Sequence, residues 1–173
     1  MDEMVDVVDR DDAEVGTATR SEVHASGAWH RGVHVLVFNS RRELLIQRRS
    51  ATKDKAPGAL DLSVSEHARA GESFEEAALR GLREELGIES AAITPLLKFR
   101  MEYGPGDNMI STLFRSDYAG SVRPDSSEVE EVLPMNHERL SRLLNDPKEV
   151  TTAWTREILN WYLSLPSKVE VMG

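Results

Sequence analysis

Four charged side chains stand close together in the segment GESFEEAALRGLREELGI, which covers residues 71–88. Glu84 and Glu85 are adjacent, which separates them by about 100° on a helical wheel. Glu72 comes just before the helix, where a loop can fold it back, and Arg80 is one turn before Glu84. Clustered carboxylates at a loop–helix junction suit a hard divalent cation such as Mg²⁺ or Mn²⁺. The alternative is a solvated face, because Glu/Arg pairs four residues apart commonly support exposed helices.

The elements that must position these side chains begin with the segment itself. Ser73 and Glu76 form a capping box, and Gly87 stands where a helix end needs a left-handed residue. Apolar residues recur at helical spacing between these caps and predict a buried stripe of Phe74, Ala78, Leu82 and Leu86, widened by Leu79. The remaining face then carries the charged residues Glu75, Glu76, Arg80, Arg83, Glu84 and Glu85. The segment therefore predicts an amphipathic helix with the candidate ligands on its charged face.

The whole pattern resembles the Nudix box, G-x5-E-x7-R-E-U-x-E-E-x-G-U, in which U is apolar. The matching residues are Glu72, Arg80, Leu82, Glu84, Glu85, Gly87 and Ile88. Two positions depart from the pattern, because the opening glycine is Glu66 and the first glutamate of R-E-U is Gly81. The resemblance implies an α/β fold, a Nudix-type α/β/α sandwich with a mixed central sheet. It also implies cleavage of a diphosphate linked to another group, with divalent metal.

The two departures affect the metal site that the resemblance implies. The family's metal-binding face maps onto positions 81, 84 and 85, so Gly81 removes a central carboxylate and should weaken metal binding. A close backbone contact would equally explain this glycine. Glu66 either blocks the tight loop that the family glycine permits or supplies the missing carboxylate from the loop side. The candidate metal ligands are Glu66, His67, Glu72, Glu84 and Glu85.

Other charged residues are candidates for contact with substrate or metal. Cations must offset the charge of a phosphate, and the candidates are Arg48, Arg49, Lys53 and Lys55. Arg49 has the best position, since it ends a predicted strand before the box; each of the four could equally be solvated. The resemblance assigns Arg80 the orientation of a carboxylate and makes Glu72, Glu84 and Glu85 its partners in catalysis. Later acidic residues that could complete the metal set, or simply be exposed, are Asp107, Glu128, Glu130 and Glu131.

Residues from about 24 to 120 are similar to the branch of the superfamily close to isopentenyl diphosphate isomerase. His67 matches a histidine of that branch, and His24 and His30 stand near the other two. A remnant metal site of these three histidines with Asp107 is therefore an alternative to the glutamate site. His34 stands inside an apolar strand and is interpreted as a core histidine.

Isomerase activity itself is not expected. The cysteine that the isomerase uses is replaced by Ser65, and a key acid is replaced by Met109. The chain contains no cysteine at all. An acid–base protonation of an alkene would thus lack two of its groups.

Composition excludes several functional classes. The chain has 173 residues and a formal net charge of −9, which argues against nucleic-acid binding and against an anionic membrane surface. The lack of cysteine excludes disulfides, thiolate zinc sites and a cysteine nucleophile. No secretory signal is visible, and no apolar run approaches the roughly 20 residues that span a bilayer. We therefore expect a cytoplasmic protein, and a homodimer if it self-associates, because homodimers are common.

The rest of the chain predicts one domain over residues 1–173. A hairpin is expected within about 1–20, the box occupies about 66–88, and two helices are expected within about 136–164. Further strands are predicted at 32–39, 43–49, 60–65, 96–103, 109–118 and 128–133. A stripe of Trp154, Ile158, Trp161 and Tyr162 is interpreted as core packing.

The leading hypothesis is a metal-dependent hydrolase that cleaves a diphosphate linkage in a small nucleoside-diphosphate-like or prenyl-like substrate. The alternative is a degenerate Nudix domain that binds a phosphorylated metabolite or a protein without efficient turnover. Gly81, Glu66 and Met109 are the features that favour the alternative.

Overall fold

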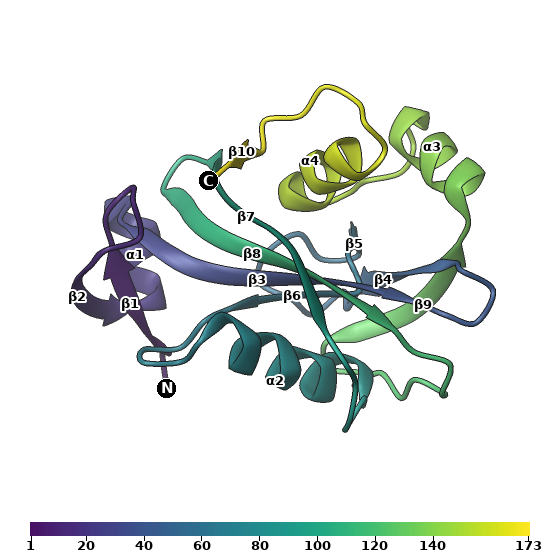
Figure 1. Ribbon diagram of the computed structural model, residues 1–173, viewed down its shortest axis with the longest axis horizontal. Helices are drawn as coiled ribbons and strands as arrows, with labels where there is room; N and C mark the ends of the chain where they lie inside the picture. The colour runs from purple at the N-terminus through teal and green to yellow at the C-terminus, as the bar shows by residue number, and fades with distance from the viewer.

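The computed structural model describes residues 1–173 as a sheet of ten strands with four helices (Figure 1). The strands are β1 (Met4–Val8), β2 (Glu14–Thr19), β3 (Trp29–Phe38), β4 (Leu44–Arg49), β5 (Leu60–Asp61), β6 (Val64–His67), β7 (Thr94–Gly104), β8 (Asp107–Asp117), β9 (Val129–Met135) and β10 (Glu170–Val171). The helices are α1 (Arg20–Ser26), α2 (Phe74–Leu86), α3 (His137–Asn145) and α4 (Ala153–Tyr162). None of these helices is long and apolar enough to cross a membrane.

Strand β3 is the centre of the sheet. One edge pairs in parallel with β8 along nearly its whole length, from His30 with Met109 to Phe38 with Asp117. The other edge is shared by three strands in turn, β1, β6 and β4, all antiparallel to it. The sheet is therefore mixed, and the predicted α/β sandwich is confirmed.

The core is divided between the two faces of this sheet. Side chains alternate along β3, so that Val33, Val35 and Val37 pack with α2 while Leu36 and Phe38 pack with α3 and α4. Figure 1 shows α2 on one side of the sheet and α3 and α4 on the other. Burial of both strand faces explains why β3 reads as an almost continuous apolar run.

Helix α2 forms where its caps predict it. Ser73 and Glu76 make both bonds of the capping box, at 3.1 and 2.9 Å, and Gly87 ends the helix with a φ of 65°. On the charged face of α2, Arg80 and Glu85 are only 5% and 6% exposed, so the alternative of a merely solvated face is wrong for these two residues. These two side chains turn inward towards polar partners on β4 and β6, which the helix pattern alone does not reveal.

Three other parts of the fold differ from the prediction. The segment 60–65 is not one strand: Leu62 N donates to Asp61 Oδ1 and to Thr155 Oγ1 instead of a neighbouring strand, so β5 and β6 are separate. Helix α1 and strand β10 were not predicted. The expected N-terminal hairpin, β1 with β2, and the two C-terminal helices are confirmed, with Asn136 and Thr152 as helix caps.

Candidate active site

A cavity of about 230 Å³ opens between α2, the centre of the sheet and the loop after β4. Seventeen residues line it and only three of them are hydrophobic. The polar lining comes from elements that are far apart in the chain, including β3, β4, β6, α2, β7 and β8. A cavity of this polarity suits a charged or hydrogen-bonding ligand better than an apolar one.

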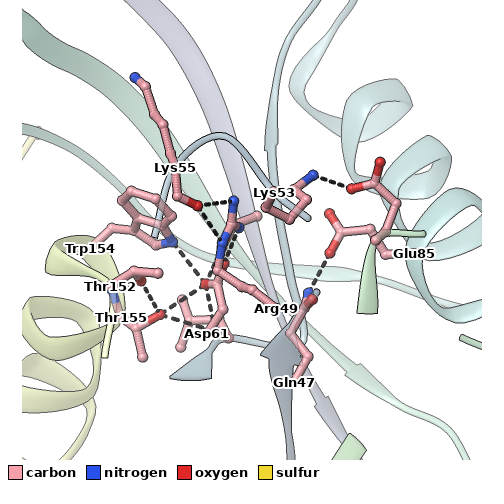
Figure 2. Close-up of polar contacts among 12 residues, drawn as sticks. Gln47, Arg49, Lys53, Lys55, Asp61, Glu85, Thr152, Trp154 and Thr155 are labelled. Atoms are coloured by element: carbon pink, nitrogen blue, oxygen red, sulfur yellow. Dashed lines mark hydrogen bonds and ion pairs between the residues drawn. The ribbon is translucent and has the colours of Figure 1, made fainter. Parts of the chain in front are cut away.

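Two carboxyls from different elements meet at the α2 side of the cavity. Glu85 on α2 accepts a hydrogen bond from Gln47 Nε2 on β4, as Figure 2 shows, and it lines the cavity together with Glu66 on β6. Burial, followed by repulsion from Glu66, raises the pKa of Glu85 well above its ordinary value. Burial also raises the pKa of Glu66, although Arg80 opposes this. Two buried acids this close favour sharing a proton or binding a cation.

Arg80 holds the carboxylates of this region in place. Its guanidinium donates to Glu72 Oε1 at 2.9 Å and to the backbone oxygen of His67 at 2.8 Å. It also reaches Glu66 at 3.4 Å and Glu84 at 3.3 Å. Arg80 does not line the cavity, and the orienting role expected for it stays a prediction.

The other two box glutamates lie differently from Glu85. Glu72 lies outside the cavity, against Arg80, in a shallow surface depression. Its burial raises its pKa, but the hydrogen bonds and charge of Arg80 outweigh this and leave the pKa of Glu72 below its usual value. Glu84 lines the cavity with a side chain that is 48% exposed. The structure therefore brings Glu66, Glu84 and Glu85 together at the cavity and leaves Glu72 outside it.

Three histidines gather beside the carboxylates. His24 comes from α1, His30 from β3 and His67 from β6, and one ring nitrogen of each lies within 4.8 Å of the others. The Nε2 atoms of His24 and His67 are 3.2 Å apart. Burial lowers the pKa of all three, most of all for His67, so the rings are neutral, which is the form that binds metals.

One atom of this cluster has no partner. His30 is fully buried, and its Nδ1 donates to the backbone oxygen of Ala28 at 3.1 Å, because a carbonyl can only accept. Its Nε2 therefore carries a lone pair and makes no hydrogen bond. A buried acceptor without a partner is costly, and a metal ion held by the three histidines would satisfy it. These residues fit a divalent metal.

Asp107 completes the set that the sequence offered as a remnant metal site. Its Oδ1 lies 3.5 Å from His24 Nδ1 and makes no hydrogen bond. Lys55 Nζ also lies 3.2 Å from His24 Nδ1. His67 belongs to this cluster rather than to the group of glutamates.

Three of the four predicted phosphate-binding cations line the cavity. Arg49, Lys53 and Lys55 lie at its wall, and Lys53 pairs with Glu128, which also lines the cavity. Arg48 does not: it donates to Gly58 O at 3.2 Å and pairs with Glu131 in a different depression. Adjacent strand residues point to opposite faces of the sheet, so β4 offers the cavity only one of its two arginines.

Asp61 organises the inner wall of the cavity, and no sequence pattern pointed to it. It is fully buried, accepts from Trp154 Nε1 at 2.8 Å and pairs with Arg49 at 2.8 Å (Figure 2). Its further donors are Leu62 N, Ser65 Oγ and Thr155 Oγ1. The interpretation of Trp154 as core packing alone is therefore incomplete, because this side chain also lines the cavity.

A polar chain of three residues continues that wall. His34 Nδ1 lies 3.0 Å from Ser65 Oγ, and its Nε2 lies 3.1 Å from the hydroxyl of Tyr103. All three line the cavity, and burial lowers the pKa of His34 to about 4. His34 is buried, as its apolar strand predicts, yet it faces the site. Gln47 was also missed; a glutamine inside the apolar run LLIQ was the one available signal.

Comparison with known proteins agrees with this arrangement. Residues 28–162 match the NUDIX domain family. The chain belongs to the Nudix family. Members of this family are generally metal-dependent pyrophosphohydrolases. The box carboxylates and the cavity described above thus lie within the part of the chain that the Nudix match covers.

Two kinds of name occur among the relatives, isopentenyl-diphosphate Delta-isomerase and uncharacterized Nudix hydrolase. The chain is 30% identical to the isopentenyl-diphosphate Delta-isomerase 2 of Photorhabdus laumondii, over 92% of each chain. It is 37% identical to an uncharacterized Nudix hydrolase of Streptomyces coelicolor, over 74% of this chain and 71% of that one. Among solved structures, that of DR0079 from Deinococcus radiodurans matches with a TM-score of 0.79 and 25% identity, over 92% of this chain and 98% of that one.

Proposed function

We propose that this Nudix protein hydrolyses the diphosphate linkage of a small nucleoside-diphosphate-like substrate with Mg²⁺ or Mn²⁺. One observation carries the proposal: acidic and basic side chains from different elements line a single cavity. Glu84 and Glu85 come from α2, and Arg49, Lys53 and Lys55 come from the end of β4 and the loop after it. A diphosphate needs both, since the cations offset its charge while the carboxylates hold a metal against it.

The protein's own groups have separate tasks in this mechanism. Glu84 and Glu85 would hold the metal on the α2 side, and the three histidines offer a second place for one. A bound divalent ion neutralises phosphate oxygens and lowers the pKa of a bound water. Lys53 and Lys55 bind and orient the phosphates, and Glu85, whose pKa is raised by burial, would bind the metal as the ionised carboxylate after releasing its proton. Arg80 keeps Glu72 and Glu84 oriented without contacting substrate.

The inner wall of the cavity supports a polar group attached to the diphosphate. His34, Ser65 and Tyr103 present hydrogen-bonding atoms there, next to the indole of Trp154. A prenyl chain could make no hydrogen bond to this polar wall, and covering the wall with an apolar group would remove its polar atoms from water, which costs binding energy. A nucleoside offers ring and hydroxyl groups that can bond to them.

Isomerisation of isopentenyl diphosphate, the activity in the names of several relatives, is not part of the proposal. Ser65 and Met109 stand where the isomerase pattern has a thiol and an acid, and the chain contains no cysteine. The methyl of Met109 lies directly over Gly32, so this side chain fills space against β3 without offering a proton.

A second candidate is a domain that binds a phosphorylated metabolite with little turnover. Gly81 favours it, because helix α2 lacks one of the carboxylates of the Nudix box. The same cavity would then bind the diphosphate without activating water.

The test is hydrolysis of a panel of nucleoside diphosphate derivatives with Mg²⁺ and with Mn²⁺, with isopentenyl diphosphate included. E85Q is the matched inactive variant, because it removes the charge and keeps the shape. Metal-dependent turnover that E85Q loses would support the hydrolase. A folded protein that is silent on the panel, yet melts at a higher temperature with a nucleoside diphosphate, would support the binding domain instead. Conversion of isopentenyl diphosphate to its isomer would contradict both.

A further inference from the structure

The space beside Gly81 is already occupied. A Cβ atom built on Gly81 would lie 2.5 Å from Val64 Cγ1 and 3.0 Å from Glu66 Cγ. It would also lie 3.7 Å from Glu66 Cβ. The side chain of Glu66 therefore runs through the volume that a residue-81 side chain would need. A glutamate at 81 and a glutamate at 66 cannot both fit without a shift.

Glu66 also directs its carboxyl to the place where a glutamate at 81 would act. On the helical wheel, position 81 falls between 84 and 85. The Glu66 carboxyl lies 3.4 Å from Arg80 Nη1, which also reaches Glu84, and it is close enough to Glu85 for each carboxyl to affect the pKa of the other. All three glutamates line the cavity.

The backbone of β6 keeps this side chain in place. Glu66 pairs with Val33 on β3, and the next residue, His67, places its ring in the histidine cluster. That cluster also holds the unpartnered Nε2 of fully buried His30, next to His67, whose side chain lines the cavity, and it points independently to a cation beside the cavity. The carboxyl of Glu66 is thus held in register beside a cluster that already contains an unpartnered ligand atom.

We propose that Glu66 supplies, from strand β6, the metal-binding carboxylate that helix α2 lacks at Gly81. The two departures from the Nudix box are then one coupled exchange: the glutamate has moved from the helix to the strand, and the glycine has moved from the loop to the helix. The proposal rests on the proposed function, whose metal site it completes. The competing interpretation is that Glu66 is only an ion-pair partner of Arg80.

Metal affinity distinguishes the two interpretations without any substrate. E66Q keeps the size of the side chain and removes its charge, and E75Q, which changes an exposed glutamate on helix α2, is the matched control. Mg²⁺ binding is measured by calorimetry, because Mg²⁺ prefers oxygen ligands. Mn²⁺ binding is measured by electron paramagnetic resonance in an H24N background, which weakens the histidine site. We expect E66Q to bind both ions at least about tenfold more weakly than wild type and E75Q to match wild type. Wild-type affinity in E66Q would overturn the proposal.

Moving the carboxylate back to the helix is the second test. G81E alone should bind Mg²⁺ no better than wild type and should melt at a lower temperature, because the new side chain meets Val64 and Glu66. In a V64A background, which makes room, E66G should lose Mg²⁺ affinity and E66G/G81E should regain it. Failure of V64A/E66G/G81E to bind better than V64A/E66G, with both folded by circular dichroism, would overturn the exchange.

These outcomes separate the proposal from the proposed function. Loss of Mg²⁺ binding in E66Q with no turnover on any substrate would keep the ligand assignment and reject the hydrolase. Turnover that E85Q loses and E66Q retains, at unchanged Mg²⁺ affinity, would keep the hydrolase and reject Glu66 as a ligand.

Discussion

Two groups of side chains at this site differ in construction. The carboxylate wall, Glu66, Glu84 and Glu85, lines the cavity from one helix and the strand packed beside it, and its charges are partly compensated by Arg80. The histidine wall, His24, His30 and His67, comes from one helix and two strands, and only His67 of the three lines the cavity. The first wall consists of acids and is made largely by local sequence. The second is neutral and exists only because β3 pairs with β6 and because His24 of α1 lies against His30 and His67.

His67 joins the two walls. Its ring belongs to the histidine cluster, while its backbone oxygen accepts a hydrogen bond from Arg80 at 2.8 Å. A change at one wall can therefore alter the other through the position of β6. The predictions below separate the walls, beginning with the largest expected effect.

E85Q should have the largest effect on chemistry. We expect kcat/KM for diphosphate hydrolysis to fall by about 100-fold or more, because a buried anionic group in direct contact with the reacting centre is removed. Co²⁺ binding at the histidine wall, followed by visible absorption, should stay as in wild type. E84Q should lose less, because Glu84 is half exposed. Equal losses of kcat/KM in E84Q and E85Q would contradict the larger role given to Glu85.

H67N should have the complementary effect. Removal of one of three nitrogen ligands should weaken Co²⁺ or Zn²⁺ binding at the histidine wall by about 10- to 100-fold. Mg²⁺ affinity at the carboxylate wall, measured by calorimetry, should change far less, since this substitution keeps the backbone oxygen that Arg80 uses. A parallel loss of both affinities would show that the walls form one site.

The pH dependence of stability should depend on His34, which belongs to neither wall. Its pKa is lowered to about 4 in the fold by burial, against roughly 6.5 in an unfolded chain. Between these values the unfolded chain binds more protons, so stability falls as the pH is lowered through this range and is unaffected by His34 above it. From pH 7.5 to 5.0, the free energy of unfolding should fall by about 2 kcal/mol more in wild type than in H34N. Urea titrations of both proteins at the two pH values measure this difference. An equal fall in the free energy of unfolding in wild type and in H34N would contradict the prediction.

Substitution of a cation that lines the cavity should give the smallest of these effects. K55M should raise KM for a nucleoside diphosphate about tenfold, because one charge-assisted contact to phosphate is lost. R48M should leave KM unchanged, since Arg48 lies outside the cavity. Both substitutions remove one positive charge, so steady-state kinetics on the two variants test whether only the cation that lines the cavity contacts the phosphate. An equal rise in KM for R48M would place Arg48 in the site after all.

The sequence by itself determined helix α2 and its Nudix box. The capping box, the C-terminal glycine and the apolar stripe act within a few residues of one another, so no distant contact is needed to predict them. The strands β3, β4 and β8 were similarly visible as apolar runs. The family followed from the same local pattern, and so did the first candidate ligands, Glu84 and Glu85.

Only the tertiary structure decided how these residues are used. The turning of Arg80 and Glu85 towards the interior, the separation of Arg48 from Arg49, and the meeting of three histidines all depend on which strands pair. The exchange between Glu66 and Gly81 depends on the packing of β6 against α2, which puts the side chain of Glu66 where a side chain at position 81 would lie. Several of these contacts join residues far apart in the chain, such as Gln47 with Glu85 and His24 with His67. Local sequence sets the conformation of a segment, whereas packing between segments sets which side chains share a cavity.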